Sequence, residues 1–463
     1  MPKTKKLMKS RTLITPLLLA TIMLVATSAV SYAQIEDAFT AVRHMSLGWN
    51  LGNTFDSNSG DTTNMWIEHW TDRAPSDYET AWGQPLATRE LIHMLHEAGF
   101  NAIRVPVTWY PHLGAKFSFS TWENSIWSPS KDFNGVNMDA AWMKRVHEVV
   151  DYVIDEGMYC ILNVHHDTGA SSAAWLIADE QHYAASRERF ETLWRCIATE
   201  FKDYGDKLLF EGYNEMLDPF RSWCFASYGS PSHYDAATAS AAYKAINSYA
   251  QSFVDAIRST GGNNTQRNLI VTTYGACSGA GTWNDHLKDP LKQMTLPEDI
   301  TPRHLVFEIH AYPNINNLSN TKYEIDDMIA ALDRHLVAKG APVIIGEWGT
   351  LNSESDYASH RADMLAFARY FSAAATRAGM ANFYWMGLTD GADRAVPQWT
   401  QADIKEAILA GWREAGGGTA ITPTAADADE SVHSGVYDLS GRPTTDSYSG
   451  LVITNGQKRL IRP

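Results

Sequence analysis

The sequence has few cysteines, no glycine-rich phosphate loop, and fewer basic than acidic residues. None of the four cysteines forms a CxxC pair, which argues against a zinc ribbon or a thioredoxin-like motif. No Gly-rich dinucleotide or phosphate motif follows any predicted strand, which argues against a nucleotide-binding open sheet. The net charge of −15 makes nucleic acid and anionic lipid poor partners. The cysteines are Cys160, Cys196, Cys224 and Cys277.

The only long apolar run lies near the N-terminus, and residues 1–33 have the composition of a cleaved export signal. Five basic residues precede a mostly apolar stretch at 13–25, and Ser31-Tyr32-Ala33 offers small residues for cleavage. We therefore expect a secreted or cell-surface mature chain beginning at Gln34, without membrane insertion. A retained membrane anchor is the alternative, but the run is short and no stop-transfer pattern follows it.

Short apolar runs alternate with amphipathic helical stretches along the rest of the chain. Such alternation implies a parallel sheet, and the apolar fraction of 44% is ordinary for a soluble globular protein. Because polar residues follow the runs, we expect a (β/α)8 barrel rather than an open doubly wound sheet. The expected strands are 47–53, 101–107, 159–164, 208–213, 269–273, 304–309, 343–346 and 382–385.

We expect the barrel to occupy residues 34–418 and to end at the glycine run 416–418. Residues 419–463 begin with a small, acidic stretch of linker composition. Two short strands, 436–439 and 451–453, then predict a C-terminal β appendage with a basic end. A piece of this size buries little core by itself.

Two glutamates, Glu215 and Glu347, each follow a strand-like apolar run. A single glutamate in this position is more often a helix cap or a surface residue. In a barrel, however, both would lie at the same C-terminal face. Two carboxyl groups about 5–5.5 Å apart are what retaining glycoside hydrolysis requires.

Other polar and aromatic residues at the predicted strand ends fit the same chemistry. Arg104 beside a carboxylate would keep it ionised, as a nucleophile must be. Asn214 can bind a sugar hydroxyl, and Trp385 can stack on a pyranose ring. The remaining residues at strand ends are His165, His310 and Tyr312.

Tryptophan is abundant, with sixteen residues, and most of them fall at strand ends or in the loops that follow. A rim of exposed aromatic rings would suit a flat, extended ligand. Packing of long loops is the alternative for part of the set. The residues concerned are Trp66, Trp70, Trp82, Trp109, Trp122, Trp127, Trp175, Trp223, Trp283, Trp348, Trp385 and Trp399.

The run His165-His166-Asp167 is a candidate metal site, since two histidines and an aspartate can bind zinc. Neighbouring residues of a strand face opposite ways, so only one histidine is expected to reach the barrel mouth. We expect neither a catalytic metal nor another cofactor.

Several stretches, in order along the chain, resemble glycoside hydrolase family 5, the cellulase family of retaining (β/α)8 enzymes. The resemblance implies that Glu215 is the acid/base and Glu347 the nucleophile. It further implies that Arg104 and Tyr312 position the nucleophile. His165, Asn214 and His310 would line the −1 subsite, with Trp385 as its platform. The matching stretches are GWNLGNTFD at 48–56, GFNAIRVPVTW at 99–109, NVHHD at 163–167, FEGYNEM at 210–216, HAYP at 310–313 and IIGEWG at 344–349.

The resemblance implies an endo-β-1,4-glucanase whose partner is a β-glucan polysaccharide. Xyloglucan, mixed-linkage glucan and mannan remain alternative substrates, because the stretch MGLTD at 386–390, directly after Trp385, departs from the pattern of many members. A non-catalytic glucan-binding barrel is the alternative from another class. The stretches SGVYDLSGRP at 434–443 and GLVITNGQKRLIRP at 450–463 resemble a type IX secretion sorting tail, which implies secretion machinery as a partner.

Overall fold

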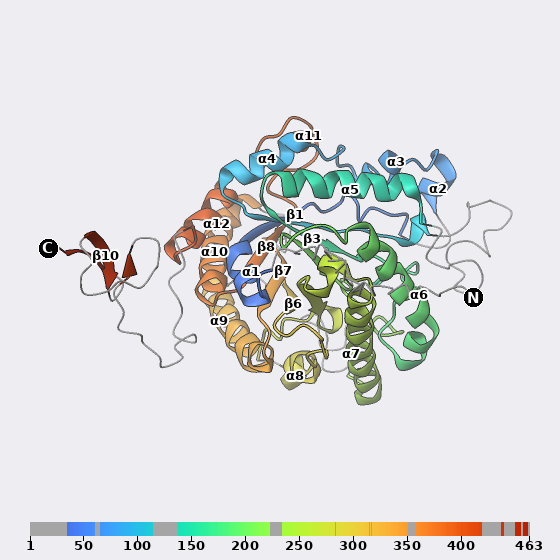
Figure 1. Cartoon of the computed structure of the whole chain (residues 1–463). Helices are drawn as coiled ribbons and strands as arrows, with labels where there is room; N and C mark the ends of the chain where they lie inside the picture. Colours follow the sequence, from blue (N-terminus) through green and yellow to red (C-terminus); the bar gives the residue numbers. More distant parts are fainter. Residues whose placement is uncertain are drawn as a thin grey trace, which may run out of the picture.

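Eight parallel strands close into a barrel in chain order, with β8 paired to β1 (Figure 1). The expected (β/α)8 fold is therefore confirmed. The computed structural model describes residues 35–60, 65–113, 138–222, 234–282, 284–313, 315, 317–350, 357–418, 437–438, 450–454 and 457–461. The barrel strands are β1 (Leu47–Asn50), β2 (Ala102–Val105), β3 (Tyr159–Asn163), β4 (Leu208–Glu211), β5 (Leu269–Thr272), β6 (Leu305–Ala311), β7 (Val343–Trp348) and β8 (Ala381–Trp385).

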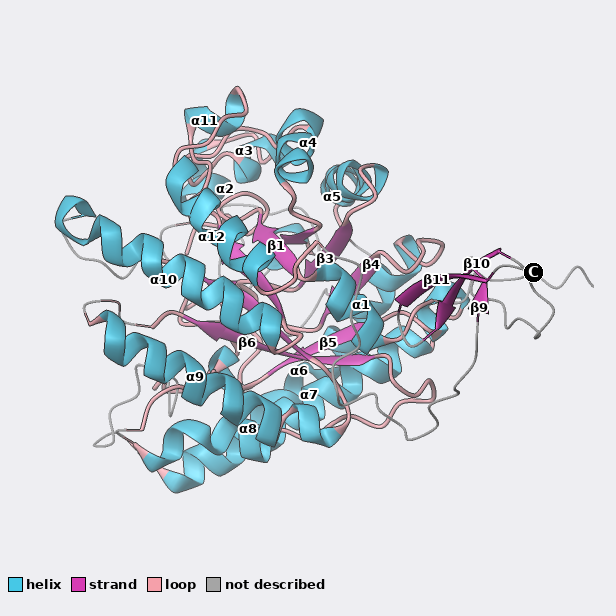
Figure 2. Ribbon diagram, turned by 90° about the vertical axis from the view of Figure 1, so that its left-hand side faces the viewer, coloured by secondary structure: helices cyan, strands magenta, loops and turns pink. Residues whose placement is uncertain are grey.

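Helices surround the barrel (Figure 2). Within the described residues, no helix is both long and apolar enough to span a bilayer. The helices are α1 (Ala38–Met45), α2 (Trp66–Trp70), α3 (Pro75–Glu79), α4 (Arg89–Ala98), α5 (Ala140–Asp155), α6 (Glu180–Glu200), α7 (Ala236–Arg258), α8 (Asp289–Gln293), α9 (Leu318–His335), α10 (Tyr357–Arg377), α11 (Ala392–Ala395) and α12 (Ala402–Glu414).

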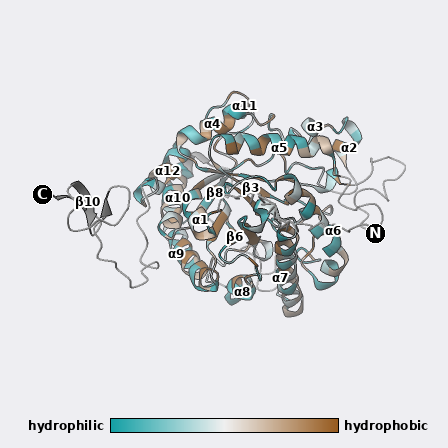
Figure 3. Cartoon of the chain, in the orientation of Figure 1, coloured by the Kyte–Doolittle hydropathy of each residue, from teal (hydrophilic) through white to brown (hydrophobic). Residues whose placement is uncertain are grey.

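The ring helices form where apolar residues recur at helical spacing and suitable caps bound them. In α4, the Thr88 hydroxyl accepts a hydrogen bond from the Leu91 amide, and Gly99 ends the helix at a φ of 109°. Both boundaries agree with the sequence. The apolar residues Trp142, Val146, Val149 and Val153 of α5 are buried. Figure 3 shows that the helix carries both hydrophobic and hydrophilic residues.

Helix α1 closes the N-terminal end of the barrel. Its buried residues share one apolar cluster with inward-facing side chains such as Ile161, Leu209 and Ile344. The Ala38 amide donates to the Arg303 carbonyl just before β6. In β1, Gly48 leaves room for the ring of Phe383, because a Cβ at position 48 would lie 2.1 Å from a carbon of that ring.

Strand ends differ from the expected ones in both directions, because β1 stops at Asn50, short of residue 53, whereas β6 and β7 run on. Both strands run two residues further than their apolar runs, so His310 and Glu347 lie within strands and pair with each other. The register shifts between Ile309 and His310, which marks a β-bulge. The pairing continues through residues with polar side chains because backbone groups make the hydrogen bonds between strands. A hydrophobic pattern in the sequence does not reveal such an extension.

The C-terminal residues include a separate antiparallel sheet of three strands in the order β11-β10-β9. The two expected strands are present as β9 (Tyr437–Asp438) and β10 (Gly450–Thr454), and β11 (Gln457–Ile461) falls in the basic end. The predicted linker lies outside the described residues. Cys160 lies in β3 and Cys196 in α6, as expected, while Cys224 lies outside the described residues.

Candidate active site

Glu215 and Glu347 come together at the C-terminal end of the barrel. Glu215 lies four residues beyond the end of β4, and Glu347 is the penultimate residue of β7. One carboxylate oxygen of each lies within 4.8 Å of the other. Inverting glycosidases need about 6.5–9.5 Å between the two carboxyl groups, to leave room for a water molecule. The shorter spacing suits a mechanism in which one carboxylate attacks the sugar directly.

The Glu347 carboxylate is held at both oxygens. Arg104 Nη1 donates to Oε1 at 2.8 Å, and the Tyr312 hydroxyl donates to Oε2 at 2.9 Å. Burial raises the pKa of Glu347, and the charges of His310 and Arg104 oppose that rise. A carboxylate with two donors and adjacent cations is oriented and stabilised in its ionised form.

Arg104 organises this end of the barrel through all of its N–H groups. It binds both oxygens of Glu211, at 2.6 and 2.7 Å, in a bidentate pair that is fully buried. Its remaining donors reach Glu347, Asn50 Oδ1 at 3.0 Å and Asn214 Oδ1 at 2.8 Å. Because Asn214 accepts from Arg104 through its oxygen, its amide nitrogen is left to bind a ligand.

His310 lies between the two carboxylates. Its Nδ1 is 2.8 Å from Glu215 Oε1 and 3.5 Å from Glu347 Oε2, and its Nε2 is 3.6 Å from Glu308 Oε1. Burial acts against the charged imidazole, but the three carboxylates outweigh it and raise the pKa of His310 to about 10. His310 is therefore positively charged at neutral pH, and its charge lies between Glu215 and Glu347.

His165 and Trp385 form one wall of the site. Their rings are stacked, with centroids 5.8 Å apart and planes 6° from parallel. Asn163 donates to His165 Nδ1 at 3.0 Å, so His165 Nε2 carries the proton and points towards Glu347, 3.9 Å away. Burial lowers the pKa of His165 well below its usual value, which keeps the ring neutral.

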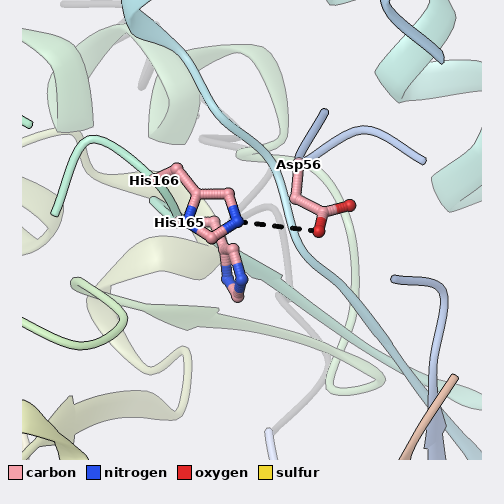
Figure 4. Close-up of side chains that lie close together, drawn as sticks. All are labelled: Asp56, His165 and His166. Atoms are coloured by element: carbon pink, nitrogen blue, oxygen red, sulfur yellow. Dashed lines mark ion pairs between the residues drawn. The ribbon is translucent and has the colours of Figure 1, made fainter. Parts of the chain in front are cut away.

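The expectation that His165 and His166 face opposite ways is wrong. Their rings lie edge to face with centroids 4.5 Å apart, and His166 Nε2 is 3.9 Å from Asp56 Oδ2 (Figure 4). Strand alternation does not apply because β3 ends at Asn163, before both histidines. Asp167 points elsewhere and accepts hydrogen bonds from the Trp109 amide and the Trp175 indole.

The candidate metal set of His165, His166 and Asp167 therefore does not converge, since Asp56 and not Asp167 groups with the two histidines. Burial raises the pKa of Asp56 to about 6, and its Oδ2 accepts no hydrogen bond within the described residues.

The predicted rim tryptophans within the described residues divide into three groups by exposure. Trp109 and Trp348 are fully buried, and Trp348 stacks on Phe371 at 4.4 Å, so both pack loops and strands. Trp70 is 83% exposed. Half-buried rings are Trp66, Trp82, Trp175, Trp385 and Trp399, while Trp122, Trp127, Trp223 and Trp283 lie outside the described residues.

All residues predicted for the site from the sequence lie around the two carboxylates. Sequence reasoning missed the supporting residues Glu211, Glu308, Asn50 and Asp56. A signal for two of them was present, because Glu211 and Glu308 are acidic residues inside otherwise apolar strands. Buried charges of this kind are rarely tolerated without a partner.

A closed (β/α)8 barrel with two adjacent carboxylates at its C-terminal face defines a glycoside hydrolase. Residues 62–388 match the family described as Cellulase (glycosyl hydrolase family 5). The chain belongs to this family.

Named relatives and solved structures agree with this assignment. Endoglucanase A of Clostridium longisporum is 31% identical over 407 residues, which cover 83% of this chain and 68% of that protein. A solved GH5-4 broad-specificity endoglucanase from an uncultured bacterium is 48% identical, with a TM-score of 0.73 over 82% of this chain and 97% of that one. A family 5 enzyme from Prevotella bryantii B14, solved with a xyloglucan tetradecasaccharide, is 37% identical, with a TM-score of 0.68 over 82% of this chain and 100% of that one.

Proposed function

We propose that the protein is a retaining endo-β-1,4-glucanase that hydrolyses internal bonds of β-glucans by double displacement. The observation that carries the proposal is the pair of carboxylate oxygens, from Glu215 and Glu347, within 4.8 Å of each other at the barrel mouth. Membership of family 5 and the endoglucanase names of its relatives support the reaction class.

In the first step, Glu347 attacks the anomeric carbon and Glu215 protonates the leaving glycosidic oxygen. Arg104 and Tyr312 hold both oxygens of Glu347, so the nucleophile needs little reorganisation to attack. His310 donates to one oxygen of Glu215, which leaves the other oxygen for the leaving group.

In the second step, Glu215 removes a proton from water, which attacks the glycosyl-enzyme and releases Glu347. The negative charge of Glu347 is absent in the intermediate, since its oxygen is bonded to the sugar. Glu215 therefore acts first as the acid and then as the base of the two steps.

The remaining residues bind the sugar that contributes the anomeric carbon. The amide nitrogen of Asn214 is available for a hydroxyl, because its oxygen already accepts from Arg104. Trp385 offers a half-exposed ring face, held in orientation by its stack with His165. These contacts match the −1 subsite roles that the family resemblance implies.

Glucans that carry xylose branches or contain mixed linkages are alternative substrates within this proposal. One solved relative is named a broad-specificity endoglucanase and another was solved with xyloglucan, which supports testing these substrates beside linear β-1,4-glucan. Mannan is a further alternative. A non-catalytic glucan-binding role is disfavoured because both carboxylates and their donors are present.

The test compares wild type, Glu215→Gln and Glu347→Gln on a panel of soluble β-glucans, xyloglucan and mannan. Each substitution is expected to reduce kcat by at least about 10²–10⁴-fold, which is the usual contribution of a positioned general acid or base. On an aryl cellobioside with a good leaving group, Glu215→Gln should still release the aryl group in a burst, because that leaving group needs no protonation. Glu347→Gln should show no burst.

Glu79→Gln is the matched control, since Glu79 is buried and paired with Arg145 outside the site. It should keep kcat. Wild-type rates in either active-site variant would refute the assigned roles.

We further propose that the chain is exported through residues 1–33 and that residues 419–463 serve as a type IX sorting tail. The basic and apolar composition of the N-terminus and the tail motifs support this. In a host with the type IX system, secreted enzyme should begin at Gln34, and deletion of 419–463 should retain activity in the periplasm. Unchanged secretion of the truncated chain would contradict the sorting role.

A further inference from the structure

The ends of α4 and α5 bring two histidines and a glutamate together on the outer surface of the barrel. His93 and His96 lie one turn apart on α4, and Glu156 is the residue that caps the C-terminus of α5. From this convergence we infer that His93, His96 and Glu156 form a surface site for a divalent transition-metal ion of the zinc type.

The three side chains already have nearly the geometry that zinc needs. Nδ1 of His93 lies 3.1 Å and Nδ1 of His96 lies 3.0 Å from the same oxygen of Glu156. All three ligand atoms lie within 4.8 Å of one another. In tetrahedral zinc with bonds of about 2.0–2.1 Å, neighbouring ligand atoms are about 3.3 Å apart. The two distances to Glu156 are therefore close to those of a zinc site.

The local charge also favours a dication. Two helices, α4 and α5, end here, and helix C-termini carry partial negative charge. Glu156 adds a full negative charge at the C-terminus of α5, where a carboxylate is unfavourable without a cation. The charge of Glu97 also attracts positive charge at His93. The nearest basic side chain on α4, Arg89, is paired with Asp155. One dication would replace the two protons that now link the imidazoles to Glu156.

The ligand set and its exposure fit an open zinc site. Two histidines and a glutamate are a known zinc ligand set with room for water at a fourth position. The side chains of His93 and His96 are 57% and 44% exposed, so the ion has direct access from solvent. Both helices end next to the beginnings of β2 and β3, at the barrel end opposite the Glu215–Glu347 pair. Binding should therefore tie α4 to α5 without changing catalysis.

The test uses the full-length chain without a histidine tag, stripped of metal by dialysis against a chelator. Zn²⁺ is titrated calorimetrically, and Co²⁺ is followed by its visible absorption, which reports nitrogen and oxygen coordination. We expect one saturable site, a rise in Tm with Zn²⁺ and an unchanged kcat. His93→Gln and His96→Gln should each weaken Zn²⁺ binding by at least about tenfold and abolish the rise in Tm.

His182→Gln is the matched control, because His182 is a similarly exposed histidine paired with a single carboxylate, Asp179. This variant should bind Zn²⁺ as the wild type does. Two outcomes overturn the inference: no saturable uptake by the wild type, or uptake that persists unchanged in both His93→Gln and His96→Gln. Zn²⁺ that inhibits the enzyme while binding those variants equally well has bound in the active site, and this also overturns it.

Discussion

Gly346, one residue before Glu347, is the position where an added methyl group should do the most damage. A Cβ there would lie 1.6 Å from Glu308 Oε1, 2.6 Å from its Cδ and 3.0 Å from its Cγ. The whole side chain would have to move, not only its tip. Glu308 has little freedom, because Thr272 donates to its other oxygen at 3.1 Å and Arg104 Nε lies 3.4 Å away.

We expect Gly346→Ala to lower the free energy of unfolding by about 3–5 kcal/mol. Overpacking alone costs about 1–3 kcal/mol, and disturbing a buried charge beside its partners costs more. For a domain of this size, roughly 2 °C per kcal/mol converts this to a fall in Tm of about 6–10 °C. Because Glu308 touches both His310 and Arg104, kcat should fall as well.

Thermal unfolding and kcat on a soluble β-glucan measure both effects. Gly205→Ala is the matched control, since an added Cβ there meets nothing within 4 Å, and it should stay within about 0.5 kcal/mol of wild type. Combining Gly346→Ala with Glu308→Ala should recover stability relative to the sum of the single changes, because the clash disappears. A Gly346→Ala enzyme with wild-type Tm and kcat would refute the reasoning, as would strict additivity.

Three further predictions concern the site. Arg104→Lys keeps the charge but not the planar fork that holds Glu211 and Glu347, so kcat should fall about 10²-fold or more with a smaller change in KM. The pKa of Asp56 is raised from 3.8 to about 6, so stability falls as pH rises through this window. Asp56→Asn should therefore raise the free energy of unfolding at pH 7.5 by up to about 3 kcal/mol, which is seen as a higher Tm. Below pH 4 it should give no gain. An unchanged melting curve at pH 7.5 would argue against that burial cost. Prolonged EDTA treatment should leave kcat unchanged, whereas a metal hydrolase would lose activity.

The barrel itself could be predicted from the sequence because its strands are short apolar runs separated by amphipathic helices. Each predicted strand is present, with ends shifted by one to three residues. The shifts occur where polar residues begin: β1 stops at Asn50 and β4 at Glu211, whereas β6 and β7 continue their pairing through His310 and Glu347. Helix α1 was not predicted, although Ala38, Ala41, Val42 and Met45 have the spacing of a buried helical face.

The grouping of site residues was predictable because strand ends in a parallel barrel share one face. The supporting contacts were not. Arg104 bonds to residues 54, 107 and 243 positions away in the chain, and only closure of the barrel decides which of them it meets. The orientation of His166 depended on where β3 ends, and an error of one residue there reverses the expected direction of a side chain.

Helix α1 covers the beginnings of the strands, whereas the carboxylate pair lies where the strands finish. A partner protein genetically joined ahead of Ile35 would thus emerge on the side of the molecule turned away from the polysaccharide. Immobilising the enzyme through that end should leave long polysaccharide chains free to reach Glu215 and Glu347.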